Sequence, residues 1–212
     1  MKILVIGASG RVGGKLVEKL LDAGHNVVGT TRKEAALFDH PRYTQIQLDL
    51  TSSREHLAQT IPAGVEAVYF VSGSRGKKLL EVDLHGAIKS MQAAEDQGIK
   101  RYIMLSTLFA LDTSKWTNAG IESLKDYYIA KHYADSYLTN NTQLNYTILQ
   151  PASLTEKSGS GKIAVDVDDS GENSIEDVAE VLVQLLENTD AKQRVITMHE
   201  GKMPIEAALA TL

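Results

Sequence analysis

The 212-residue sequence contains no cysteine, and this absence excludes several kinds of function. Without cysteine there is no disulfide framework, no thiolate metal ligand and no cysteine nucleophile. A cysteine-free chain is compatible with a reducing compartment, and we expect a cytoplasmic protein. We predict no metal site either, because metal-ligand spacing to nearby carboxylates is missing around the six histidines, His25, His40, His56, His85, His132 and His199.

Long runs of one residue type are also missing. No uninterrupted apolar segment approaches the roughly 18 to 20 residues that a membrane span requires. A net charge of −5 without a long Lys/Arg block argues against nucleic acid as the main partner. The first residues show no cleavage-site pattern and read as a strand rather than a signal peptide. We therefore expect a single domain that acts on a small molecule, away from membranes and nucleic acids, with a homo-oligomer left open.

Short β-rich runs alternate with amphipathic helical stretches from end to end. Seven runs are strand candidates: residues 2–7, 26–31, 43–48, 66–71, 101–106, 145–150 and 194–199. This alternation predicts an α/β fold of the Rossmann type, a doubly wound parallel sheet of about seven strands with helices on both faces. We expect residues 1–212 to form one domain, in which 151–212 make a small substrate-side portion with a helix near 175–187, a last strand and a terminal helix.

Three hydroxyl residues are each followed by an acid three positions later. The pairs are Ser52 with Glu55, Ser123 with Asp126, and Ser174 with Asp177, and each predicts a capping box at a helix start. One Gly/Ser-rich stretch, KSGSGK at 157–162, predicts a mobile loop. It suits a plain connection and an active-site lid equally well.

A glycine triplet follows the first strand candidate in GASGRVG, residues 7–13. Gly7, Gly10 and Gly13 permit a tight turn in which backbone N–H groups approach a pyrophosphate at the positive end of the next helix. Placed between a strand and an amphipathic helix, the triplet is a strong signal for dinucleotide binding. The predicted cofactor-binding residues of this turn are Gly7, Ser9, Gly10, Arg11, Val12 and Gly13.

The end of the second strand candidate indicates which dinucleotide is bound. An acidic residue there would bond the ribose 2′-hydroxyl of NAD, but the sequence reads Thr31, Arg32 and Lys33. Hydroxyls and cations suit a 2′-phosphate, and Arg forms paired hydrogen bonds with phosphate. We predict NADP(H), with NAD(H) less favoured. The alternative is that Arg32 and Lys33 are ordinary solvated charges.

Two further strand ends complete the predicted cofactor site. Asp49 and Leu50 close the third strand candidate, where they can meet the adenine, although Asp49 could equally cap the next helix. Val71, Ser72 and Gly73 follow the fourth, where small residues let the cofactor pass close to the backbone. A simple turn is the alternative for this second segment.

Tyr127 and Lys131 lie four residues apart on one predicted helix face. A lysine ammonium one turn away favours the phenolate, so we expect it to lower the pKa of Tyr127 and make the phenol a proton donor or acceptor near neutral pH. Lys131 could also hold the nicotinamide ribose. Alone the pair is common on exposed helices, but beside a glycine turn it indicates a catalytic site.

The sequence resembles the short-chain dehydrogenase/reductase superfamily over nearly its whole length, specifically the atypical branch of flavin/biliverdin reductase-like and NmrA-like NAD(P)H-binding proteins. The resemblance rests on GASGRVGG, TTRK, LDLT, GIKRYIMLST, YYIAK and LNYTILQPASLTE. It implies that Tyr127 is the catalytic acid/base and that Lys131 binds the nicotinamide ribose.

The resemblance also implies a hydroxyl residue after the fifth strand that polarises the substrate carbonyl. One alignment places Leu108, which has no hydroxyl, at this position. Of the neighbouring hydroxyl residues, Thr107 is the first choice and Ser106 the second. Gln150 stands where many relatives have an arginine, and Pro151 fits a rigid turn at the substrate side of the cofactor. We expect a shallow pocket walled by residues 108–121, where Trp116 serves packing or substrate contact, and by residues 152–162.

The predicted function is an NADP(H)-dependent reductase of a small carbonyl, quinone or flavin-like acceptor. A non-catalytic NADP(H) sensor of the NmrA-like type is the alternative from another class, because fold does not decide between them. An epimerase or isomerase that uses the cofactor transiently is a third possibility, although the short C-terminal portion leaves little room for a nucleotide-sugar substrate.

Overall fold

A computed structural model describes residues 1–117 and 119–212. A parallel sheet is formed by β3 (Tyr43–Gln47), β2 (Asn26–Thr31), β1 (Lys2–Ile6), β4 (Ala67–Phe70), β5 (Arg101–Leu105), β6 (Asn145–Pro151) and β10 (Arg194–Glu200), named in spatial order. All seven strand candidates are therefore strands, and the order reverses between β1 and β4. In open α/β sheets, ligands bind at such a switch point, beyond the carboxyl ends of the strands.

The central sheet has nine strands rather than about seven. The two extra strands are β8 (Lys162–Val165), antiparallel to β10, and β11 (Met203–Pro204), antiparallel to β8. A separate two-stranded sheet pairs β7 (Ser153–Thr155) with β9 (Glu172–Ser174). The segment after Pro151 thus extends the central sheet, besides forming a small portion of its own.

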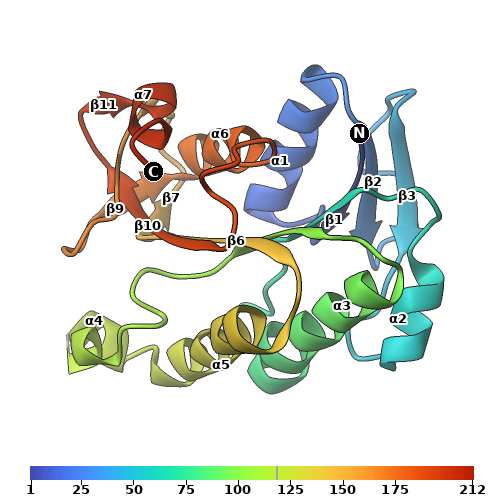
Figure 1. Cartoon of the computed structure of the whole chain (residues 1–212), viewed down its shortest axis with the longest axis horizontal. Coiled ribbons are helices and arrows are strands. Elements are labelled where there is room, and N and C mark those ends of the chain that lie inside the picture. The colour runs from blue at the N-terminus through green and yellow to red at the C-terminus, as the bar shows by residue number, and fades with distance from the viewer. Residues whose placement is uncertain (118) are drawn as a thin grey trace.

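Helices cover both faces of the sheet (Figure 1). One face carries α1 (Arg11–Asp22), α6 (Ile175–Gln184) and α7 (Ile205–Leu209). The other carries α2 (Arg54–Thr60), α3 (His85–Asp96) and α5 (Lys125–Asn141), with short α4 (Ala119–Glu122) beside α5. A π-helix, η1 (Leu79–Leu84), leads into α3, and a 3-10 helix, η2 (Thr113–Thr117), precedes α4. The Rossmann-type fold predicted from the alternation is confirmed. No described helix is long and apolar enough to cross a bilayer.

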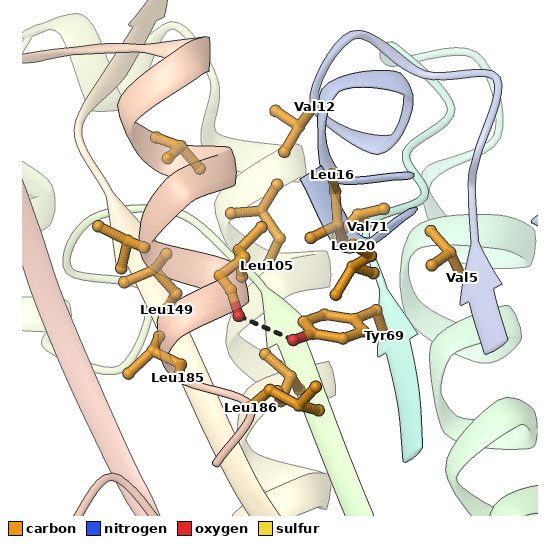
Figure 2. Close-up of a cluster of buried hydrophobic side chains, with 14 of the residues drawn as sticks. Val5, Val12, Leu16, Leu20, Tyr69, Val71, Leu105, Leu149, Leu185 and Leu186 are labelled. Atoms are coloured by element: carbon orange, nitrogen blue, oxygen red, sulfur yellow. Dashed lines mark hydrogen bonds between the residues drawn. The ribbon is translucent and has the colours of Figure 1, made fainter. Parts of the chain in front are cut away.

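The core between the sheet and α6 joins distant parts of the chain (Figure 2). Leu16 and Leu20 from α1 and Leu185 and Leu186 beyond α6 are all buried in this cluster. The fully buried Tyr69 of β4 donates its hydroxyl hydrogen bond to the carbonyl of Leu182 at 2.8 Å. This bond satisfies a polar group in the core and fixes α6 against the sheet.

Of the three serines predicted to begin a helix, only one is the N-cap. Ser174 caps α6, and its hydroxyl accepts from the N–H of Asp177 at 2.9 Å. For α2 the cap is Ser53 instead of Ser52, with its hydroxyl accepting from the N–H of His56. Ser123 is no cap, because α5 begins at Lys125 and the Ser123 hydroxyl donates to the Gly120 carbonyl.

Candidate functional site

The glycine turn is packed too tightly for side chains at two of its glycines. Gly7 has a φ of +102°, and a Cβ there would lie 2.8 Å from the backbone of Ser72. A Cβ on Gly13 would lie 2.1 Å from the carbonyl oxygen of Gly7. Gly10 is the N-cap of α1, and its N–H donates to the Gly7 carbonyl at 2.9 Å. The turn therefore presents bare backbone at the start of α1, which suits a pyrophosphate.

A cleft of about 550 Å³ lies at the carboxyl ends of β1 to β4 and reaches from the glycine turn across Thr31 to the loop after β4. It brings together ten of the predicted cofactor residues: Gly7, Ser9, Gly10, Thr31, Arg32, Asp49, Leu50, Val71, Ser72 and Gly73. These residues come from four separate strand ends. The cleft therefore has the position that a dinucleotide occupies in this fold.

Asp49 faces this cleft and does not cap α2. Its carboxylate accepts from the N–H and the hydroxyl of Thr51, at 2.9 and 2.8 Å. These hydrogen bonds lower its pKa, and the nearby charges of Lys78 and Arg32 add to the effect. Asp49 is therefore a fixed acceptor on the cleft wall between two cations.

Six other predicted cofactor residues do not line the cleft in the described structure, and one of them, Lys131, lies on α5. Val12 is buried in the core beside the sheet, Gly13 packs on Gly7, and Arg11 pairs with Glu156 at 3.0 Å. The N–H of Lys33 donates to the Thr31 hydroxyl, and buried Pro151 accepts a hydrogen bond from the N–H of Leu108. Their contribution to the site is through the backbone and packing, except for Lys131 and the exposed cations Arg11 and Lys33.

Three cations that the sequence analysis did not select line the same cleft. Arg75, Lys77 and Lys78 follow β4 in the loop before η1. Arg75 and Gly76 both have positive φ angles, of 54° and 80°. The signal was present as GSRGKK, but a basic loop can be placed over a cleft only when the sheet order is known. The cleft is electropositive on two sides, which suits an anionic ligand.

Tyr127 and Lys131 lie on α5, and the expected effect of the lysine on the tyrosine is wrong. Burial raises the pKa of Tyr127, and the charge of Asp83 raises it further. Lys131 is 3% exposed, and its ammonium donates to the carbonyl of Leu105 at 2.8 Å. Because Tyr127 is half-buried near a carboxylate, its phenol holds its proton more firmly than that of a free tyrosine.

The two candidate hydroxyls after β5 have different surroundings. Ser106 is buried and donates to the carboxylate of Asp135 at 2.7 Å. Thr107 is half-buried, and its hydroxyl lies 3.5 Å from that of Tyr128 and close enough to Tyr127 to affect its pKa. Since an ionised carboxylate only accepts hydrogen bonds, the proton of Ser106 is committed to Asp135, whereas Thr107 lies beside the tyrosines.

Asp83 connects the cleft with the tyrosine and the lysine. It belongs to η1, is 1% exposed, and accepts two hydrogen bonds from the N–H of Ser74, a cleft-lining residue, at 3.0 and 3.2 Å. Its charge acts on both Tyr127 and Lys131. Through Asp83, Tyr127 and Lys131 of α5 are therefore linked to the end of the cleft at Ser74. Asp83 also belongs to a π-helical turn, and such turns are frequent at functional sites.

Trp116 serves packing and also lines a second cavity. Its ring meets those of Tyr128 and His132 edge-on, and its indole N–H donates to the Phe109 carbonyl at 3.0 Å. It also borders a cavity of about 390 Å³, whose other lining residues are Thr117, Ile121, Glu122 and Lys125. Much of the segment 108–121, which was predicted to wall the substrate pocket, thus lies beside α5. Residue 118 of this segment lies outside the described residues.

Comparison with known proteins identifies the family. The NAD(P)H-binding family matches residues 7–189, and the chain belongs to this family. It is 36% identical, over all of both chains, to a Bacillus subtilis (strain 168) protein named "Uncharacterized sugar epimerase YhfK". The crystal structure of the oxidoreductase ylbE from Lactococcus lactis is 43% identical, with a TM-score of 0.97 over 100% of this chain and 96% of that one.

A more distant structure has the same fold. A short-chain dehydrogenase/reductase from Veillonella parvula DSM 2008 in complex with NADP is 21% identical, with a TM-score of 0.74 over 96% of each chain. The chain therefore has the same fold as this short-chain dehydrogenase/reductase. The chain is a member of an NAD(P)H-binding family of oxidoreductase-like and epimerase-like proteins.

Proposed function

We propose that this protein is an NADP(H)-dependent reductase of a small carbonyl, quinone or flavin-like acceptor. The observation that carries the proposal is the position of Asp83, which is hydrogen-bonded to the cleft residue Ser74 and whose charge acts on Tyr127 and Lys131. A cofactor that lies along the glycine turn extends toward this pair in the Rossmann arrangement. A binding cleft and a proton donor thus adjoin each other.

The residues present fit NADP(H). Gly7 and Gly13 let the turn pack closely on the backbone, so that Gly7, Ser9 and Gly10 line the cleft where the pyrophosphate would lie. Arg32 would hold the 2′-phosphate together with Thr31 and Lys33, since no acid stands at this strand end to repel it. Asp49 and Leu50 would meet the adenine, and Lys131 would hold the nicotinamide ribose.

In this proposal the bound cofactor supplies a hydride, and the chain supplies the proton. The phenol of Tyr127 carries its proton at neutral pH and would be the general acid toward the acceptor oxygen, and its raised pKa makes it a weaker acid than a free tyrosine. Thr107 is the hydroxyl that polarises this oxygen, because the Ser106 hydroxyl is held by Asp135. The acceptor gains the hydride on carbon or nitrogen and the proton from Tyr127, a two-electron reduction in total.

Epimerisation is the second candidate, favoured by the name of the Bacillus subtilis relative. The same tyrosine and lysine would serve it, but an epimerase returns the cofactor to its starting state after each turnover. Net consumption of NADPH therefore distinguishes the two functions. A reductase consumes one NADPH per acceptor, whereas an epimerase interconverts two substrate isomers without net consumption.

The test is a titration of the nucleotide-free protein with NADPH and NADH, followed by nicotinamide fluorescence. We expect tighter binding of NADPH, and Arg32→Gln should weaken it by about tenfold or more while leaving NADH affinity unchanged, because NADH lacks the 2′-phosphate. Carbonyl, quinone and flavin acceptors are then screened for NADPH oxidation. If neither nucleotide binds, the proposal is wrong. Binding without turnover of any acceptor would favour a sensor.

A further inference from the structure

Asp135 is a fully buried carboxylate one helical turn after Lys131 on α5. One of its oxygens, Oδ2, accepts from the Ser106 hydroxyl at 2.7 Å and from the Gln150 amide at 2.9 Å. The other, Oδ1, is buried and has no hydrogen-bond partner among the residues that the structure describes. An unpaired buried acceptor destabilises the fold, so stability alone does not explain an acid here.

The charged groups that act on Asp135 are Lys131 and then His132, both on α5, while the neutral Ser106 follows β5 and the neutral Gln150 lies in β6. Asp135 acts in turn on Tyr127 of α5, and Asp83 of η1 acts on Tyr127 and Lys131. Burial lowers the pKa of Lys131, and the two carboxylates, Asp135 first, raise it again. Each buried charge therefore depends on the others, since an isolated ammonium would lose its proton at this depth.

We propose that Asp135 is a positioning residue whose buried negative charge keeps Lys131 in its ammonium form, ready to bind the nicotinamide ribose. Asp135 acts through Lys131 and touches neither cofactor nor substrate. This inference rests on the proposed function for the role of Lys131, but the charge coupling itself exists without a cofactor. It goes beyond the tyrosine–lysine pair because it names the group that keeps Lys131 charged in a buried site.

Asp83 is less suited to this role than Asp135. Its carboxylate already accepts both hydrogen bonds from Ser74 and so anchors the loop that follows β4. Asp135 receives only neutral donors on one oxygen and leaves the second oxygen unpaired, on the same helix as Lys131. The charge of Asp135 can therefore be removed while the hydrogen bonds from Ser106 and Gln150 stay in place.

The competing interpretation is that Asp135 only ties α5 to β5 and β6. Asp135→Asn separates the two readings, because the asparagine carbonyl oxygen can still accept from Ser106 and Gln150 while the charge is gone. With burial unchanged and the counter-charge removed, the pKa of Lys131 falls further. A purely structural tie predicts no such change.

The first experiment measures NADPH affinity from neutral to alkaline pH for the wild type and three variants. The wild type should lose affinity where Lys131 loses its proton, and Asp135→Asn should move this midpoint to lower pH by about one unit or more, a tenfold change in protonation at a given pH. Ser106→Ala, which keeps the charge, should retain the wild-type midpoint. Lys131→Met should bind more weakly and show no midpoint. A wild-type midpoint in Asp135→Asn, or a persistent midpoint in Lys131→Met, would overturn the inference.

The second experiment needs neither a cofactor nor an Asp135 variant. The ε-carbon of Lys131 is labelled with ¹³C and assigned by its disappearance in Lys131→Met. Burial raises the pKa of Asp135 to about 6, so the Lys131 resonance should shift as the pH passes through that region. A resonance that ignores this titration would refute the coupling. If the shift is seen but NADPH does not bind, the proposed function fails while the charge coupling stands.

Discussion

Gly13 and Gly14 are adjacent in the first turn of α1 but have different surroundings. A Cβ on Gly13 would lie 2.1 Å from the Gly7 carbonyl oxygen, whereas one on Gly14 would lie 3.8 Å from that of Ala8. We expect Gly13→Ala to destabilise the protein by about 1–3 kcal/mol and to abolish NADPH binding, because the turn must open. Gly14→Ala should be neutral or stabilising by up to about 1 kcal/mol, since alanine favours a helix. Urea unfolding and NADPH titration measure both effects, and equal stability of the two variants would contradict this account.

Tyr127→Phe tests the proton donor. The variant keeps the ring and its packing but removes the hydroxyl, so NADPH affinity should remain near that of the wild type while turnover falls by about 10²–10⁴-fold. Tyr133→Phe is the matched control, because Tyr133 lies on the same helix and is 58% exposed. Rates of NADPH oxidation with the best acceptor from the screen provide the measurement. Full activity of Tyr127→Phe would remove Tyr127 from the mechanism.

Single residues show what the sequence could predict of the site. The glycine turn, Arg32 and the Tyr127–Lys131 spacing are local patterns, so they could be identified without a structure. The direction of the Tyr127 pKa could not, because it depends on burial and on Asp83, a residue 44 positions earlier in the chain. Asp135 could not be identified for the same reason, since its hydrogen-bond partners, Ser106 and Gln150, lie far from it in the sequence.

At the scale of elements, the start of α6 tests helix capping. Ser174→Ala removes the hydroxyl that accepts from the Asp177 N–H, and we expect a loss of about 1 kcal/mol in the free energy of unfolding. Ser123→Ala is the control with the same sequence pattern, and it should cost only a few tenths because Ser123 caps no helix. Chemical denaturation of both variants gives the comparison. Equal losses would mean that the pattern, and not the contact, determines the cost.

Strand prediction succeeded where the chain repeats one physical pattern. The seven parallel strands are β-rich runs of four to seven residues, and each run could be identified from the sequence alone. The four missed strands, β7, β8, β9 and β11, have two to four residues each. In such short strands, pairing depends on neighbours brought together by the fold rather than on local preference. Two of the three predicted helix starts, at Ser52 and Ser123, were wrong. A serine three residues before an acid does not by itself determine where a helix begins.

At the scale of the whole molecule, the C-terminal segment is part of the main structure. The helix α6 packs on α1, and β10 extends the central sheet beside β6. Arg101 of β5 is buried and donates to the carbonyls of Leu186 and Asn145, at 3.1 and 2.9 Å. The strands that hold the cleft and the segment after residue 151 therefore share one core and one hydrogen-bond network.

This shared core predicts a single unfolding transition. Leu182→Ala removes a fully buried side chain of α6, and we expect a loss of about 2–5 kcal/mol. Far-UV circular dichroism follows the helices, while the fluorescence of Trp116 reports on η2, which is not part of α6. If the chain unfolds cooperatively, both signals should shift together, and NADPH should raise both midpoints because it binds only the folded state.

Leu80→Ala is the control for this experiment, because Leu80 is 67% exposed and its truncation should change stability by about 0.5 kcal/mol or less. A Trp116 transition that stays at the wild-type midpoint while the circular dichroism shifts would show that the C-terminal segment unfolds separately. The proposed site would then rest on the first 150 residues alone, since its cleft and the Tyr127–Lys131 pair all lie before Pro151. Coincident transitions would instead mean that damage to α6 reaches the cofactor site through the core they share.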